Sequence, residues 1–170
     1  MEMESQRTDE LEHLGKLIKD LRTGMLTTLE SDGSLRSRPL VTLKMDSEPA
    51  LWFLTSISSP KVAELDQHAK VGLTYSNGDS DFVSVSGDTW ILRDRDLIQG
   101  LWTPLAKIWF PEGADDPDLA ALKVLIRHAE YWDGPDSKLV QLFSIAQAAI
   151  SGEESDLRTE NEKLEVSQRR

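Results

Sequence analysis

The feature that most limits the fold of this chain is a series of short, strand-like apolar runs separated by turn-forming residues. The segments MLTTLE (residues 25–30), LRSRPLVTLK (residues 35–44) and ALWFLT (residues 50–55) are separated by SDGS and MDSEP, which are rich in turn formers. We therefore expect these three segments to form an antiparallel meander. Pro39 lacks a backbone N–H, so the second segment should lie at an edge, carry a bulge or face a ligand.

Further strands are expected in the second half of the chain. Residues 71–76 and 82–94 alternate apolar and small polar side chains around the loop NGDSD, which predicts a second hairpin. Residues 119–134 fit both a helical and a strand period, so their state stays open. Residues 103–118 are irregular and loop-like.

Helices are expected around these strands, at residues 8–21, 60–68, 94–102 and 138–150. Thr8 is a plausible N-cap for the first helix, and Ser58 or Ser59 can cap the second, which has Pro60 in its first turn. The pattern as a whole indicates a mainly β fold, a small β-barrel with flanking helices. We expect one domain over residues 1–150 and a polar, acid-rich tail over residues 151–170 that is disordered or a frayed helix.

The composition excludes several functional classes. The 170 residues carry a net charge of -11, which argues against nucleic-acid binding because phosphate neutralisation needs a basic face. No apolar run approaches the roughly 20 residues of a membrane helix, and the acidic N-terminus does not resemble a secretory signal. We expect a cytoplasmic protein. It has no cysteine, and its three histidines lack ligand spacing, so no metal site is expected.

One stretch stands out in so acidic a chain: FLTSISSPK, residues 53–61. A strand that ends in hydroxyl residues and leads into a helix beginning with Pro60 and Lys61 places hydroxyls, backbone N–H groups and a positive helix end together. Arg36 and Arg38 lie on a neighbouring segment and could add charge-assisted contacts to a phosphate. In the alternative interpretation Ser58 or Ser59 only caps the helix and the basic side chains are solvated. Spacing alone favours this alternative.

A resemblance to a known family favours the phosphate site. The order of DGSLRSRPL, LWFLTSISSPKVAEL, VGLTYS, VSVSGDTWIL, WFPEGADDPDL and AEYWD resembles the general-stress-protein branch of the pyridoxamine 5'-phosphate oxidase-like, FMN-binding split-barrel family. The resemblance extends from about Leu14 to Gly152. It implies a six-stranded antiparallel split barrel with peripheral helices, which forms a homodimer with flavin mononucleotide (FMN) bound in clefts at the dimer interface.

The resemblance also implies the residues that bind the flavin. Backbone groups of two segments would face the flavin ring, a T-x-x-x-S-x-K pattern would hold the phosphate, and an irregular segment would reach the cleft of the other subunit. In this chain the ring-facing residues are Arg38, Pro39, Leu40, Val41, Phe53 and Leu54, the phosphate residues are Thr55, Ser59 and Lys61, and the irregular segment contains Trp102, Lys107 and Trp109. The family's oxidases commonly carry arginine before that lysine, where this chain has Pro60. Arg36 or Arg38 would then have to supply the missing positive charge at the phosphate. Ser58, in the same turn, is a further candidate for cofactor binding.

The leading functional hypothesis is an FMN-binding split-barrel protein of general stress type, with FAD as an alternative cofactor. Such a protein is either a flavin-dependent oxidoreductase of unassigned substrate or a flavin carrier. No catalytic side chain is assigned, because a flavin supplies its own redox chemistry. A pyridoxamine or pyridoxine 5'-phosphate oxidase is one alternative, disfavoured because no arginine- and histidine-containing C-terminal segment is present. A dimeric interaction protein that has lost its cofactor is the other.

Overall fold

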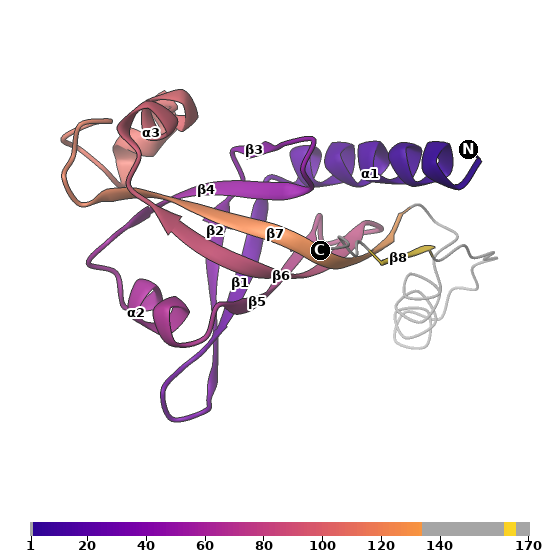
Figure 1. Ribbon diagram of the computed structural model, residues 1–170, viewed down its shortest axis with the longest axis horizontal. Helices are drawn as coiled ribbons and strands as arrows, with labels where there is room; N and C mark the ends of the chain where they lie inside the picture. The colour runs from indigo at the N-terminus through magenta and orange to yellow at the C-terminus, as the bar shows by residue number, and fades with distance from the viewer. Residues whose placement is uncertain (1, 134–161, 166–170) are drawn as a thin grey trace, which may run out of the picture.

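The structure, a computed structural model, describes residues 2–133 and 162–165. Helices border a curled antiparallel sheet, with α1 and α3 on one side of it and α2 on the other (Figure 1). The elements in chain order are α1 (Glu2–Leu21), β1 (Thr23–Leu29), β2 (Leu35–Val41), β3 (Lys44–Met45), β4 (Ala50–Ser56), α2 (Pro60–Gln67), β5 (Lys70–Ser76), β6 (Phe82–Leu92), α3 (Arg95–Leu101), a 3-10 helix (Pro104–Ile108), β7 (Leu119–Trp132) and β8 (Glu162–Glu165).

The sheet forms a half-barrel of antiparallel strands in the order β2-β1-β5-β6-β7-β4-β3. The split-barrel fold is therefore confirmed, but the predicted number of six strands is wrong. Seven strands form the path, and β8 adds a pairing to β7. The extra strand arises because the predicted segment 35–44 breaks after Val41, and its last part pairs separately as β3 with β4.

The predicted three-stranded meander is also wrong. β1 and β2 form the expected hairpin, but β4 pairs with β7 and β3 and not with β2. The chain crosses from one end of the sheet to the other within two residues, since Thr42 N donates to Arg22 O and Leu43 N donates to Trp52 O. Pro39 lies on β2, the edge strand, where its missing N–H breaks no ladder. The edge position was one of the three predicted alternatives.

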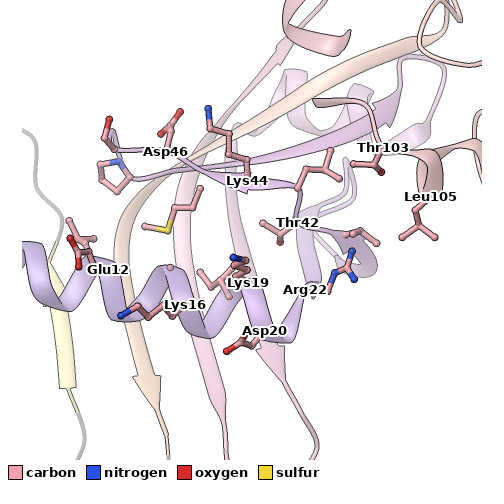
Figure 2. A pocket seen from close by; sticks show the side chains of 18 residues that line it. Glu12, Lys16, Lys19, Asp20, Arg22, Thr42, Lys44, Asp46, Thr103 and Leu105 are labelled. Carbon is pink, nitrogen blue, oxygen red and sulfur yellow. The ribbon is translucent and has the colours of Figure 1, made fainter. Parts of the chain in front are cut away.

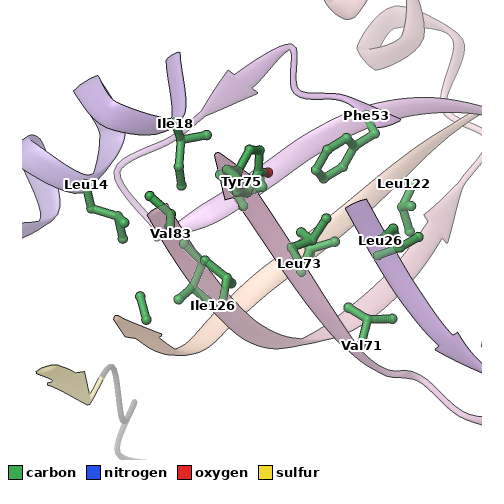
Figure 3. Packing of buried hydrophobic residues seen from close by; sticks show 14 of the residues in the cluster. Leu14, Ile18, Leu26, Phe53, Val71, Leu73, Tyr75, Val83, Leu122 and Ile126 are labelled. Atoms are coloured by element: carbon green, nitrogen blue, oxygen red, sulfur yellow. The ribbon is translucent and has the colours of Figure 1, made fainter. Parts of the chain in front are cut away.

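The main core fills the concave side of the half-barrel. Leu14 and Ile18 of α1 pack onto Tyr75 and Val83, which closes one end of the barrel (Figure 3). The inward residues alternate along β1, β5 and β6, as the strand period predicts. The buried members of this core are Leu14, Ile18, Leu26, Leu51, Phe53, Leu65, Val71, Leu73, Tyr75, Val83, Val85, Leu122, Val124, Ile126, Ala129 and Tyr131.

The open assignment of residues 119–134 is settled as a strand over Leu119–Trp132, which form β7. Its sequence lacks clean alternation because both of its faces are covered. Leu122 and Val124 face the main core, whereas Leu119 and Ala121 pack in a second cluster with α3. A register shift lies between Ser86 and Gly87 of β6, opposite β7. It returns the later residues of β7 to the main core.

The predicted helices are confirmed where the structure describes them. α1 begins at Glu2, earlier than predicted, so Thr8 lies inside the helix and is not its N-cap. The first turn of α2 contains Pro60, and Asp94 caps α3 by accepting a hydrogen bond from Leu97 N. None of the helices in residues 2–133 is long and apolar enough to cross a membrane. The predicted helix 138–150 lies outside the described residues, as does the tail except for β8.

Candidate functional site

Three residues of the predicted phosphate pattern come together at the end of β4. The Lys61 ammonium donates to Thr55 Oγ1 at 2.7 Å and to Ser59 Oγ at 3.0 Å. Ser59 occupies the N-cap position of α2, but its hydroxyl makes no capping hydrogen bond. The interpretation of Ser58 or Ser59 as a side-chain cap is therefore wrong, because the Ser59 hydroxyl accepts from Lys61 and that of Ser58 binds elsewhere.

Lys61 is a buried cation whose contacts are hydroxyl groups. Its side chain lies with Val62 and Leu65 on the buried face of α2, and only 9% of the residue is exposed. Among the described residues no carboxylate forms an ion pair with Lys61. Burial lowers the pKa of Lys61, and the charge of Arg38 lowers it further, while Glu64 partly offsets both. A buried ammonium with only hydroxyl partners is an arrangement that a bound anion would stabilise.

Arg38 is placed beside this cluster by a closed ring of hydrogen bonds. Its guanidinium donates to Glu64 Oε1 at 2.7 Å and to Thr28 Oγ1 at 2.8 Å. The Thr28 hydroxyl donates in turn to Glu64 Oε2 at 2.6 Å. Thr28, Arg38 and Glu64 are mostly buried, and the hydrogen bond from Arg38 lowers the pKa of Glu64. This ring ties β1 and β2 to α2.

A second carboxylate holds the turn between β4 and α2. Asp118, just before β7, accepts hydrogen bonds from the Ser58 backbone N–H at 2.8 Å, from the Ser58 hydroxyl at 2.9 Å and from the Ser56 hydroxyl. These hydrogen bonds lower the pKa of Asp118. Ser58 is therefore drawn away from the Lys61 ammonium, and its role in cofactor binding stays a prediction.

Arg36 does not join the cluster. It lies on the exposed face of β2 and pairs with Glu30 at 3.3 Å across the hairpin. Its side chain is 56% exposed, so screening by solvent leaves this pair weak. Of the two arginines predicted to compensate for Pro60, only Arg38 lies near Lys61.

The predicted ring-facing segments lie on the two strands that border the opening of the barrel. β2 pairs only with β1, so its second edge is unpaired along Arg38 to Val41. β3 covers β4 only at Leu51 and Trp52, so Phe53 and Leu54 keep one edge unpaired. β2 and β4 approach each other across this opening. Their free backbone groups can receive a flat polar ligand that inserts between the two edges.

The irregular segment with the tryptophans is partly a 3-10 helix and leaves large side chains exposed. Trp102 packs in the cluster beside α3, whereas Lys107 is exposed and Trp109 has an exposed fraction of 59%. Among the residues that the structure describes, no hydrogen bond or core contact joins any of the three to the Lys61 cluster. Their predicted role at the cleft of a second subunit stays a prediction.

A cavity of about 1060 Å³ lies at the other end of β4, between α1, the β3 region and the segment around Thr103 (Figure 2). Its rim mixes the cations Lys16, Lys19, Arg22 and Lys44 with the acids Glu12, Asp20 and Asp46. Among the predicted cofactor residues only Val41 lines it. We place the candidate site at Lys61, because a buried cation held by hydroxyls selects an anion. A rim that carries both signs of charge indicates no particular class of ligand.

Sequence reasoning missed three residues of the site: Thr28, Glu64 and Asp118. Glu64 could have been found, since it follows Lys61 by three positions and so lies on the same face of the predicted helix. Asp118 is 60 positions from Ser58 and sits in an acid-rich loop without a recognisable pattern. The described residues contain no group of acids and histidines that could hold a metal ion.

The comparison with known families fits this fold and this pattern. Residues 9–156 match the family described as pyridoxamine 5'-phosphate oxidase like. The chain belongs to this family. The resemblance seen in the sequence is thereby confirmed for nearly the whole described part of the chain.

Similar proteins include general stress proteins. The general stress FMN/FAD binding protein of Xanthomonas citri is 32% identical, with a TM-score of 0.64 over 76% of this chain and 92% of that chain. A Clostridium acetobutylicum protein related to general stress protein 26 has a TM-score of 0.68 at 22% identity, covering 92% of this chain and 94% of that one. The Neurospora crassa protein bli-3 is 27% identical over 166 residues, 91% of this chain and 78% of that protein.

Proposed function

We propose that this member of the pyridoxamine 5'-phosphate oxidase-like family binds a flavin nucleotide, with FMN as the first candidate and FAD as the second. The observation that carries the proposal is the buried Lys61 ammonium, which is held by Thr55 and Ser59 and has no ion-pair partner among the described residues. The similarity to the Xanthomonas citri protein, whose name states FMN/FAD binding, supports the same conclusion.

The residues present fit a flavin phosphate. Lys61 would contact its oxygens, the Thr55 and Ser59 hydroxyls would orient the ammonium, and Arg38 would add positive charge from β2. Backbone groups along the unpaired edges of β2 and β4 would face the ring. When bound, the flavin supplies hydride and single-electron transfer, and we propose an oxidoreductase whose substrate is unassigned.

The test is a fluorescence-quenching titration of the purified protein with FMN, FAD, riboflavin and pyridoxal phosphate. We expect saturable binding of FMN near one per subunit and much weaker binding of riboflavin, which has the same ring and no phosphate. Equal affinity for FMN and riboflavin would contradict the phosphate assignment. A protein that binds none of the four would instead match the cofactor-free alternative.

The lowered pKa of Lys61 predicts a dependence of FMN affinity on alkaline pH. The ammonium is required for the anion, and burial means that it loses its proton below the ordinary value of 10.5. FMN affinity, relative to riboflavin, should therefore fall as the pH rises toward that value. Calorimetric titrations across the alkaline range measure this, and an unchanged ratio would contradict the role of Lys61.

The stability of the free protein should change in the opposite direction. Between the lowered pKa of folded Lys61 and the ordinary value of 10.5, the unfolded chain binds more protons than the folded one. The free energy of unfolding attributable to Lys61 should therefore rise with pH across that window. Urea unfolding of the wild type against Lys61→Met isolates this contribution.

We further propose that the chain acts as a homodimer. The 3-10 helix and the residue after it expose three apolar side chains close together: Leu105 at 42%, Ile108 at 68% and Trp109 at 59%. Such a cluster is typical of a surface that a second protein covers. Sedimentation should give a particle of two chains. The cytoplasmic location expected from the sequence stays a prediction.

A further inference from the structure

The carboxylate of Glu64 reduces the net positive charge around the Lys61 cluster. Arg38 lies close enough to Lys61 for its positive charge to lower the pKa of Lys61. Glu64, one helical turn after Lys61, pairs with Arg38 at 2.7 Å in a place where its side chain is only 10% exposed. The two cations and this carboxylate leave one net positive charge.

We propose that Glu64 is a specificity-determining residue, which matches the site to a phosphate group carrying one negative charge and not two. The inference rests on the proposed flavin site and defines the ionisation state that it selects. Candidate ligands of this class are the pyrophosphate of a dinucleotide such as FAD and the singly ionised phosphate of FMN.

The geometry keeps Glu64 ionised and in place. Each carboxylate oxygen accepts one short hydrogen bond, Oε1 from Arg38 and Oε2 from the Thr28 hydroxyl. Because the ring is closed and mostly buried, neither Arg38 nor Glu64 can rotate away without leaving a buried group unpaired. A phosphate bound here therefore interacts with the positive charge of Arg38 and with the negative charge of Glu64 at the same time.

Other charged groups around this ring do not restore the missing positive charge. Arg36 is paired with Glu30 on the hairpin, and Asp32 and Glu30 line the surface pocket next to Glu64. On the opposite side, Asp118 adds a negative charge at the turn beside Ser58. A doubly charged phosphate would thus be undercompensated at this site.

The test uses the second ionisation of a phosphate monoester, which occurs near pH 6, with the intact protein. FMN passes from one to two negative phosphate charges between about pH 5 and about pH 8, whereas each phosphate of FAD keeps a single charge over that range. Affinities for FMN, FAD and riboflavin are measured over this range in the wild type, Glu64→Gln and Asp66→Asn. Glutamine keeps the shape of the ring and removes the charge.

Asp66→Asn is the matched control, because it removes one negative charge from an exposed position of the same helix. We expect wild-type FMN affinity, relative to riboflavin, to fall by more than about tenfold from about pH 5 to about pH 8, because the singly charged phosphate gives way to the doubly charged one. Glu64→Gln should raise FMN affinity by about tenfold near pH 8, through loss of one nearby like charge, and should change FAD affinity much less. Asp66→Asn should behave as the wild type. His68, which follows α2, is present in the wild type and in both variants, so a difference in affinity between them does not arise from this residue.

Two results would overturn the inference in different ways. If wild-type FMN affinity does not fall as the pH rises, or if Glu64→Gln shows the same fall as the wild type, Glu64 does not set the charge preference although a phosphate site exists. If FMN and FAD bind no better than riboflavin in every variant, the proposed flavin phosphate site fails, and the inference about Glu64 fails with it.

Discussion

Replacing Lys61 and Arg38 together by alanine should reduce FMN affinity to that of riboflavin. Among the described residues, Lys61 is the buried cation whose contacts are hydroxyl groups, and a hydrogen bond to a charged group contributes about 1.5–3 kcal/mol. Lys61→Ala alone should therefore weaken FMN binding by about 100-fold. Removing Arg38 as well leaves Glu64 unpaired near the phosphate, which should abolish the remaining phosphate contribution.

The controls separate loss of the site from loss of the fold. Lys70→Ala removes an equal charge from an exposed position at the start of β5 and should leave FMN affinity within about twofold, as surface changes usually do. Thermal unfolding of each variant shows whether the barrel is intact. Lys61→Ala should not be strongly destabilised, because burial already disfavours its ammonium in the folded state. Unchanged FMN affinity in a folded double variant would refute the site assignment.

Gly87→Ala should lower the free energy of unfolding by roughly 3 kcal/mol. A Cβ at Gly87 would lie 2.4 Å from the Leu125 carbonyl oxygen and 2.9 Å from a methyl carbon of Val124. Both neighbours belong to β7, whose register against β6 shifts at this point. The backbone must move to accept the methyl group, and the paired core residues must move with it.

Gly100→Ala provides the matched comparison. Gly100 lies in α3, and nothing is within 4 Å of a Cβ built there. Alanine is a better helix former, so this substitution should be neutral or should raise the free energy of unfolding by about 0.5 kcal/mol. Urea unfolding of both variants at equal protein concentration measures the difference, which keeps any dimer contribution constant. Equal stabilities would show that β6 and β7 can separate at Gly87 without cost.

Local patterns in the sequence predicted most of the helices and strands and pointed to part of the candidate site. Alternation of apolar residues predicted β5 and β6, because each of these strands has one face on the core and one on the solvent, and the turn formers after residue 30 marked the end of β1. Spacing alone favoured a helix cap at residues 53–61, and it was the family resemblance that implied a phosphate role for Thr55, Ser59 and Lys61, whose side chains lie together in the structure. The family resemblance added the split barrel.

Only the tertiary structure decided the features that depend on distant partners. β7 is buried on both faces, so its sequence has no period that separates strand from helix. The pairing of β4 with β7 in place of β2 depends on the two-residue crossing after Val41. Pro39 alone left open whether its segment lies at an edge, carries a bulge or faces a ligand. Likewise, Asp118 reaches Ser58 across 60 residues, and Glu64 neutralises Arg38 only once α2 packs against β1 and β2. Contacts between residues so far apart in the chain follow from how the sheet closes, and no local spacing encodes that closure.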